Sequence, residues 1–344
     1  MGARRAWGRG SDYGGGGQQL PVMLSKPVRI PVNGADARVM LLDTASLYFR
    51  AFYGLPLTLT APDGTPVNAV RGLLDFTARL VRDYSPTHLV ACWDDDWRPE
   101  FRVAAIPSYK AHRVAEPAAD GLSEAVPEEL AAQVPVIVDV LAALGIARVG
   151  VPGFEADDVI ATLCTKAHSP VRIVTGDRDL FQLVDDARGV AVLYTASRGV
   201  ARVELVDDAW LVAKYDIPSG TYGDYALLRG DPSDGLPGVK GVGERTASGL
   251  LRSFGDLAGI RAAAADPASD LRPAVRSKLL AASDYLDIAP SVVLTVRDLP
   301  IPDDLDARLP RQPVDPAALA ALSARWGVET SVARLTDAMD RSTR

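Results

Sequence analysis

Residues 38–53, RVMLLDTASLYFRAFY, join a short apolar run that ends in Asp43 to an aromatic-rich stretch. The run suits one buried strand, and Leu47, Phe49 and Phe52 follow at positions from which a helix could pack them beneath a sheet. Similar apolar runs recur along the chain and alternate with helical patterns. Strands that alternate with helices predict an α/β domain with a largely parallel central sheet flanked by helices. The further predicted strands are HLVACWD (88–94), IARVGVP (146–152), VRIVTGD (171–177) and VAVLYT (190–195), and the helices include 66–84, 128–144 and the stretch after Glu155.

The composition divides the chain into four expected parts. Residues 1–27 are rich in glycine and lack the apolar core of a secretion signal, so we expect a disordered tail. Residues 38–206 form the α/β domain, and within it the polar stretch at about 97–127 has no clear period, which is typical of a functional loop or arch. Residues 207–289 are helical with tight turns and form a separate helical unit. Residues 290–344, with a weak strand at 292–296 and a last helix at 317–327, are expected to pack back.

Whole-chain properties limit the class of protein. The 344 residues are 48% hydrophobic, enough for a sizeable core. The two cysteines lie in apolar runs, which favours buried thiols in the cytoplasm, and no apolar run reaches the roughly 20 residues of a membrane span. The net charge of −7 is unusual for a nucleic-acid-binding protein unless many acids gather in one metal site.

Acidic residues follow three of the predicted strands. Asp43, Asp94 and Asp177 each stand at a carboxyl end, where ligands bind in parallel α/β sheets. Any one of them could simply cap the next helix. We prefer Asp94 to Asp95 as the site residue because it is the first acid beyond its apolar run.

Further acids occur in clusters that suit divalent cations. Glu155, Asp157 and Asp158 fall within one helical turn and would repel one another without a cation. Asp177 and Asp179 are two positions apart in an extended segment, so their side chains face the same side. The three histidines show no zinc-like spacing, so oxygen ligands are expected, which favours two or more Mg²⁺ or Mn²⁺ ions. Two such ions about 4 Å apart can hold both reacting oxygens in phosphodiester hydrolysis. The predicted ligands are Asp43, Asp94, Glu155, Asp157, Asp158, Asp177, Asp179, Asp231 and Asp234.

Two other stretches predict contacts with DNA. The loop LPGVKGVGERT (236–246) has glycines whose amides can turn toward a phosphate before a helix begins, as in a helix-hairpin-helix element that grips DNA of any sequence. In the stretch 101–113, basic residues alternate with aromatic ones, which suits a single strand and a reacting phosphate. The predicted DNA-binding residues are Tyr109, Gly238, Val239, Lys240, Gly241, Val242, Gly243, Arg245 and Thr246, and the predicted phosphate clamp is Arg102, Lys110 and Arg113.

Five ordered motifs together resemble the bacterial and phage 5′-nuclease family, which includes the amino-terminal nuclease domain of bacterial DNA polymerase I and is related to the flap endonucleases. The motifs are LLDTASLYFRAFY, FRVAAIPSYKAHR, GFEADDVIATL, TGDRDLFQLV and GDPSDGLPGVKGVGERTA. The resemblance spans about residues 38–290 without a polymerase, so it implies a stand-alone 5′-3′ exonuclease. It implies a PIN-like fold with a helical arch and a helix-three-turn-helix unit, a metal site made of the nine acids, and catalytic roles for Lys110, Arg113, Arg102 and Arg50.

The resemblance also sets the expected reaction and partners. It implies two-metal cleavage of DNA near a single-strand/double-strand junction during replication and repair, by a cytoplasmic monomer. The substrates would be 5′ flaps, nicked or branched duplexes, single-stranded 5′ ends and RNA-primed strands, and K⁺ can sit at the glycine loop. The family usually has Asn at the position of Gly235. Glycine has no side chain to make the hydrogen bond by which that Asn would support the metal site. The alternatives are a branched-DNA-binding protein without catalysis and a related metal-dependent ribonuclease.

Overall fold

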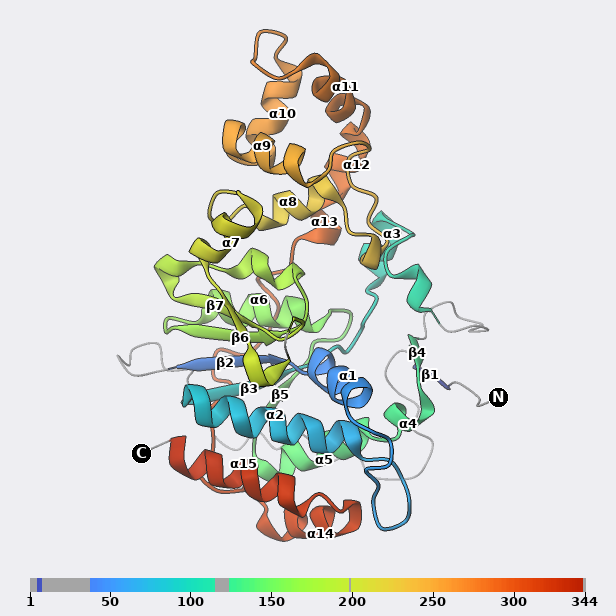
Figure 1. Ribbon diagram of the computed structural model, residues 1–344, viewed down its shortest axis with the longest axis vertical. Helices are drawn as coiled ribbons and strands as arrows, with labels where there is room; N and C mark the ends of the chain where they lie inside the picture. Colours follow the sequence, from blue (N-terminus) through green and yellow to red (C-terminus); the bar gives the residue numbers. More distant parts are fainter. Residues whose placement is uncertain (1–4, 8–37, 115–123, 198, 343–344) are drawn as a thin grey trace.

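The computed structural model describes residues 5–7, 38–114, 124–197 and 199–342. Its centre is a six-stranded sheet in the order β5-β3-β2-β6-β7-β8 (Figure 1), and only the β7–β8 pair is antiparallel. This confirms the predicted α/β architecture, and β8 is a strand that the sequence pattern had not indicated. The strands are β2 (Val39–Asp43), β3 (His88–Cys92), β5 (Ala147–Val149), β6 (Val171–Thr175), β7 (Val190–Tyr194) and β8 (Glu204–Val206).

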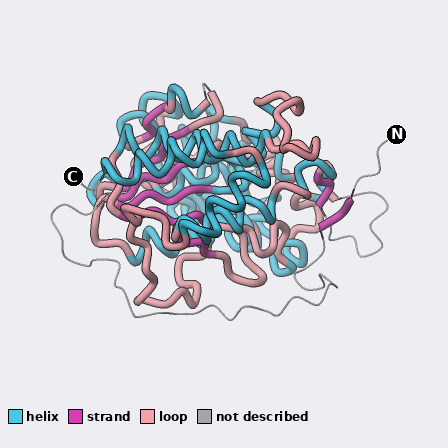
Figure 2. Tube along the Cα trace, turned by 90° about the horizontal axis from the view of Figure 1, so that it is seen from below, coloured by secondary structure: helices cyan, strands magenta, loops and turns pink. Residues whose placement is uncertain are grey.

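Helices cover both faces of the sheet, and the strands run side by side through the middle of the molecule (Figure 2). Alternate strand residues point to opposite faces. Met40 and Leu42 pack with one set of helices, and Val39 and Leu41 pack with the other set and with the helical unit. The first face carries α1 (Thr44–Gly54), α2 (Asn68–Tyr84), α5 (Val134–Leu144), α14 (Pro316–Trp326) and α15 (Glu329–Ser342), and the second carries α6 (Ala156–Lys166).

The helical unit stands above the sheet in Figure 1. Short connections separate its helices, and its core is continuous with the core on the α6 face of the sheet. The helix α7 (Asp208–Tyr215) lies against β8. The others are α8 (Tyr222–Arg229), α9 (Glu244–Phe254), α10 (Leu257–Ala265), α11 (Pro273–Ala281), α12 (Ser283–Ile288) and α13 (Pro290–Val293).

The predicted strand at 292–296 is wrong. Val292 and Val293 end α13, and the backbone of the next residues bonds to buried side chains instead of a neighbouring strand. The chain then returns to the sheet domain, where α15 packs along α2. Short 3₁₀ turns complete the connections: η1 (Ala111–Arg113), η2 (Asp179–Leu183), η3 (Asp186–Arg188), η4 (Val200–Arg202) and η5 (Pro232–Asp234).

The stretch predicted as an arch is partly helical. It contains α3 (Glu100–Ala105) and η1, and after it come β4 (Glu124–Val126) and α4 (Glu128–Ala131), whereas residues 115–123 lie outside the described residues. The predicted tail also lies outside them, except for β1 (Arg5–Trp7), which pairs with β4. Within the described part of the chain, no helix has the length and apolar character needed to cross a membrane.

Candidate active site at the carboxyl edge of the sheet

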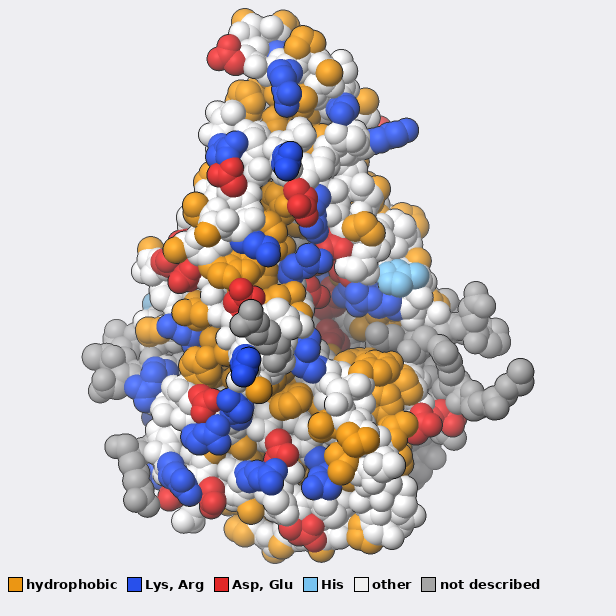
Figure 3. Space-filling view, in the orientation of Figure 1, with side chains coloured by type: hydrophobic (Ala, Val, Ile, Leu, Met, Phe, Trp, Pro, Cys, Tyr) orange, Lys and Arg blue, Asp and Glu red, His pale blue; other side chains and the backbone are white. Residues whose placement is uncertain are grey.

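A cavity of about 380 Å³ opens where β2, β3 and β6 end. The strand register pairs Asp43 with Cys92 and Leu42 with Val174, so the acids that follow these strands emerge at one edge. Figure 3 shows acidic side chains inside a hollow near the middle of the molecule, with basic side chains around it. Five of the nine predicted ligands line the cavity together with Lys110 and Arg113: Asp43, Asp94, Glu155, Asp157 and Asp177.

The strand-end acids also perform the ordinary capping role. Asp43 caps α1 by accepting from the Ser46 amide at 3.2 Å, and it accepts from the Thr175 hydroxyl at 2.6 Å. Asp94 accepts from the Ala156 amide at 2.8 Å, at the start of α6. The capping and site interpretations are therefore compatible, because these hydrogen bonds hold the carboxylates in place at the cavity.

The acids lie close enough to perturb one another. Burial, followed by the charge of Asp94, raises the pKa of Asp43 to about 7. Burial raises the pKa of Asp94 to about 6. Burial and neighbouring carboxylates raise the pKa of Asp157 and Asp179 well above the usual range. Such a cluster favours the binding of positive charge, since each ionised acid opposes ionisation of the next.

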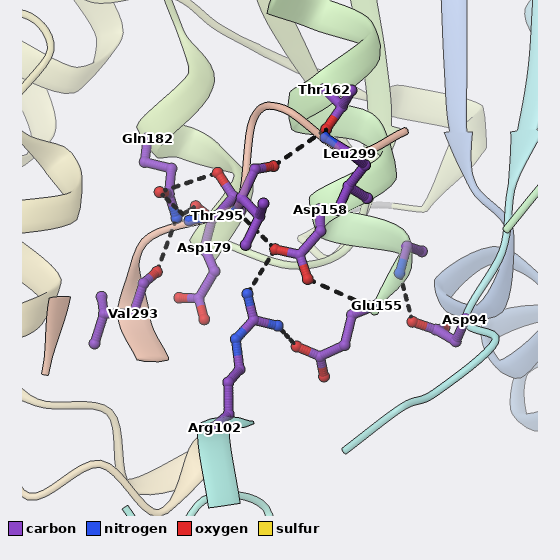
Figure 4. A network of polar contacts seen from close by, with 12 residues as sticks. Asp94, Arg102, Glu155, Asp158, Thr162, Asp179, Gln182, Val293, Thr295 and Leu299 are labelled. Atoms are coloured by element: carbon purple, nitrogen blue, oxygen red, sulfur yellow. Dashed lines mark hydrogen bonds and ion pairs between the residues drawn. The ribbon is translucent and has the colours of Figure 1, made fainter. Parts of the chain in front are cut away.

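Internal cations already neutralise one part of the cluster. Glu155 accepts from the Tyr109 hydroxyl at 2.8 Å and is in direct contact with Arg102 and Lys110. Burial acts to raise the pKa of Glu155, but the charges of Lys110 and Arg102 outweigh it and lower the pKa. Arg102 also donates to Asp158 at 2.6 Å (Figure 4).

Two residues predicted to contact DNA are buried instead. Arg102 is 2% exposed and Tyr109 is 4% exposed, so neither side chain presents itself to a substrate. They support Glu155 and Asp158, because α3 and the turn after it fold back onto the start of α6. The pattern of alternating basic and aromatic residues could not distinguish this inward arrangement from an exposed one.

Asp158 faces away from the cavity. It is fully buried, and its two oxygens accept from Arg102, from the Val296 amide at 2.8 Å and from the Glu155 amide at 3.3 Å. These three bonds occupy its oxygens on the side of α6 that packs against the C-terminal segment. Asp157, its neighbour, points into the cavity.

The acidic turn at 231–235 packs against the base of the arch. Arg113 donates to Asp234 at 2.6 Å, and Asp231 accepts from the Ser233 amide at 2.8 Å. Gly235 has a φ of +71°, and an added Cβ would lie 2.1 Å from the carbonyl oxygen of Ser108. This close approach explains glycine here, since no other residue fits without moving the arch.

Arg50 reaches the cavity edge from α1. A Cβ on Gly176, which lines the cavity, would lie 3.2 Å from its guanidinium, so glycine at this position leaves room for Arg50. Within the described part of the chain, the buried Nε of Arg50 has no hydrogen-bond partner.

The glycine loop follows the acidic turn directly. Asp231 and Leu236 exchange backbone hydrogen bonds of 3.0 and 2.8 Å, which closes the turn just before the loop begins. Of the predicted DNA-binding residues, Lys240, Gly241, Gly243 and Arg245 are exposed and Gly238 and Thr246 are half-buried, whereas Val239 and Val242 face the core. Lys278 donates to the Gly241 carbonyl at 2.8 Å.

Four aromatic side chains that the sequence pattern had not indicated also line the cavity. They are Tyr48, Phe49, Trp93 and Trp97. Leu47 and Phe52 are buried beneath the sheet as expected, and Phe49 packs against the same core and also lines the cavity. The sequence feature that could have indicated them is the pair Tyr48 and Phe49, a few residues after the strand that ends in Asp43.

Among the described residues, no three acidic, cysteine or histidine side chains are placed to contact one ion together. The chemistry of the donor set still fits divalent cations, because the cavity offers carboxylate oxygens, and a bound cation would offset the burial and mutual repulsion that raise the pKa of its acids. Any bound ion would require some of these side chains to turn.

Comparison with known families gives two adjoining matches. Residues 38–216 match the family described as 5′-3′ exonuclease, N-terminal resolvase-like domain, and residues 217–317 match 5′-3′ exonuclease, C-terminal SAM fold. A 5′-3′ exonuclease of Streptomyces coelicolor is 62% identical over 297 residues, which cover 86% of this chain and 98% of the relative.

More distant relatives match in sequence or in fold. DNA polymerase I of Mycobacterium bovis is 44% identical over 227 residues, covering 65% of this chain and 24% of the polymerase. The T5 D15 protein co-crystallised with metal ions shares the fold with a TM-score of 0.57 at 16% identity, covering 89% of this chain and 100% of that protein.

Proposed function

The chain belongs to the 5′-3′ exonuclease family and is a hydrolase of phosphodiester bonds, and we propose that it cuts DNA at or near a free 5′ end with the help of divalent cations. The observation that carries this proposal is the cavity at the sheet edge, where acids from four segments meet Lys110 and Arg113. We propose 5′ flaps, nicks and single-stranded 5′ ends as substrates, in replication and repair. The protein would act as a cytoplasmic monomer.

The acids would hold Mg²⁺ or Mn²⁺. The ligands with access to the cavity are Asp43, Asp94, Glu155, Asp157 and Asp177, with Asp179, Asp231 and Asp234 beside them. Bound ions would supply an activated water and charge stabilisation for the departing oxygen. Asp158 has the weakest case as a direct ligand, because its oxygens are already bonded on the inner side of α6.

Lys110 and Arg113 would act on the reacting phosphate. Both line the cavity, and each holds a carboxylate, Glu155 or Asp234. When a phosphate enters, these cations can exchange a carboxylate contact for a phosphate oxygen and stabilise the charge that develops there. Arg50, next to Gly176 of the cavity lining, would help to orient the same DNA strand.

The glycine loop would hold the duplex portion of the substrate. Its exposed members Lys240 and Arg245 face solvent beside backbone amides at the start of α9, a suitable arrangement for phosphates of any sequence. The acidic turn runs directly into this loop, so the backbone fixes the distance between the loop that would bind the duplex and the acidic turn at the site. A K⁺ ion at the loop would share carbonyls with Lys278, which already bonds that of Gly241.

A cleavage assay tests the proposal. Labelled 5′-flap, nicked and single-stranded DNA, with matched RNA strands, would be incubated with wild type, Asp177→Asn and the surface control Asp139→Asn, with and without Mg²⁺ or Mn²⁺. We expect metal-dependent DNA cleavage that Asp177→Asn abolishes and Asp139→Asn retains. Tight flap binding without cleavage would favour the binding alternative, and preferential cutting of RNA would favour the ribonuclease.

A further inference from the structure

The segment that leaves the helical unit passes through the polar network of Figure 4. We call residues 293–296, at the end of α13 and just beyond it, the strap. The backbone turns extended at Leu294, with φ −84° and ψ 137°. Its polar groups bond to side chains from two other elements, η2 and α6.

Gln182 of η2 pairs with the strap as a short strand would. Its side-chain oxygen accepts from the Thr295 amide at 3.0 Å, and its nitrogen donates to the Val293 carbonyl at 3.2 Å. The same nitrogen donates to the backbone carbonyl of Asp179 at 2.8 Å. Gln182 is buried, and these bonds use both N–H groups of its amide.

The opposite side of the strap bonds to α6. Asp158 accepts from the Val296 amide at 2.8 Å, and Thr162 donates to the Val296 carbonyl at 3.4 Å. Thr162 also accepts from the Leu299 amide at 3.2 Å. One extended segment therefore connects the backbone that carries Asp179 with the helix that carries Glu155 and Asp157.

The strap also lies close to the helix that leads to the acids of the turn at 231–235. The helix α8 leads into the turn that carries Asp231 and Asp234, and α13 packs against α8. A Cβ on Gly223 of α8 would lie 2.5 Å from Leu294. Glycine at this position allows α8 to approach the strap closely.

We propose that Gln182 is a positioning residue for the metal site, which acts through the strap and the backbone of Asp179. The inference rests on the proposed function of the acid cavity. Gln182 holds the segment with Asp177 and Asp179 at a set distance from the acids of α6. The affinity of the cavity for divalent cations then depends on an amide that need not touch an ion, as other supporting residues affect metal sites.

Calorimetric titration of the full chain with Mn²⁺, without DNA, tests this role. Gln182→Met keeps the length of the side chain but removes its hydrogen bonds, and we expect its Mn²⁺ affinity to fall about tenfold or more. Gln133→Met is the matched control, since Gln133 is also buried but bonds to Asn68, Ala69 and Glu129. It should lower the unfolding temperature without changing Mn²⁺ affinity.

The outcomes separate the inference from the function it rests on. Wild type that binds no Mn²⁺ would overturn the proposed metal site itself. Wild type that binds, with Gln182→Met unchanged or with both methionine variants weakened equally, would overturn the positioning role alone. If Gln182→Met does not fold, Thr295→Val decides: it removes only the hydroxyl 3.3 Å from Gln182, with an expected loss of roughly twofold, and no loss would overturn the proposal.

Discussion

Replacing Arg102 by methionine tests whether this arginine holds the acids in place. The guanidinium contacts Glu155 and donates to Asp158 at 2.6 Å, and all three side chains are at most 3% exposed. Methionine roughly fills the volume but leaves two carboxylates without their shared cation. Breaking a buried pair in this way costs about 3–5 kcal/mol, because an uncompensated charge stays buried.

The loss in Arg102→Met should depend on pH. The pKa of Glu155 is held low by Lys110 and Arg102 against the effect of burial, so in wild type its contribution is present at neutral pH and is lost on acidification. Without Arg102, the pKa of Glu155 rises although Lys110 still contacts it, and burial raises the pKa of Asp158 with no cation left to lower it. The two acids are then more readily protonated at pH 5, and the destabilisation becomes smaller there than at pH 8.

Urea denaturation followed by circular dichroism, at pH 5 and pH 8 without divalent cations, measures both effects. Arg341→Met provides the control, since Arg341 pairs with Asp337 at 3.8 Å with both side chains more than 70% exposed. Such a surface pair contributes roughly 0–1 kcal/mol. A loss in Arg102→Met no larger than the control, or equal losses at the two pH values, would refute the reasoning.

Three further predictions follow from the site. Lys110→Met should lower kcat about 100-fold or more and leave duplex binding within about twofold, as measured by single-turnover cleavage and fluorescence anisotropy; equal losses in both would contradict a role at the phosphate. Without metal, the unfolding temperature should fall as pH rises from 5 to 8, because the folded-state pKa of Asp43 is raised to about 7, and Mn²⁺ should restore more stability at pH 8 than at pH 5; a flat profile by calorimetry would argue against the acid cluster. Gly235→Ala should lose about 1–3 kcal/mol more than Gly64→Ala, since both glycines have positive φ but only Gly235 faces the Ser108 carbonyl at 2.1 Å; equal losses in urea denaturation would show that the arch base moves freely.

Local sequence predicted the sheet and the acids at its edge. Apolar runs of strand length that end in Asp43, Asp94 and Asp177 can be recognised in the sequence alone. Their acids then meet because parallel strands bring their carboxyl ends to one edge of the sheet. The glycine loop could also be predicted from the sequence, since the left-handed backbone at Gly238 and Gly241 is a local requirement that glycine meets.

The tertiary structure alone decided which of these residues face the cavity and which support it. Arg102 and Tyr109 turn inward to Glu155 across 53 and 46 residues, and Gln182 bonds to the strap across more than 100 residues. Residues 292–296 have the composition of a strand, yet Val292 and Val293 end α13, and the backbone of Thr295 and Val296 bonds to side chains of η2 and α6. Sequence periodicity reports which face of an element is apolar, but the partners of a buried polar group are set only when distant segments pack together.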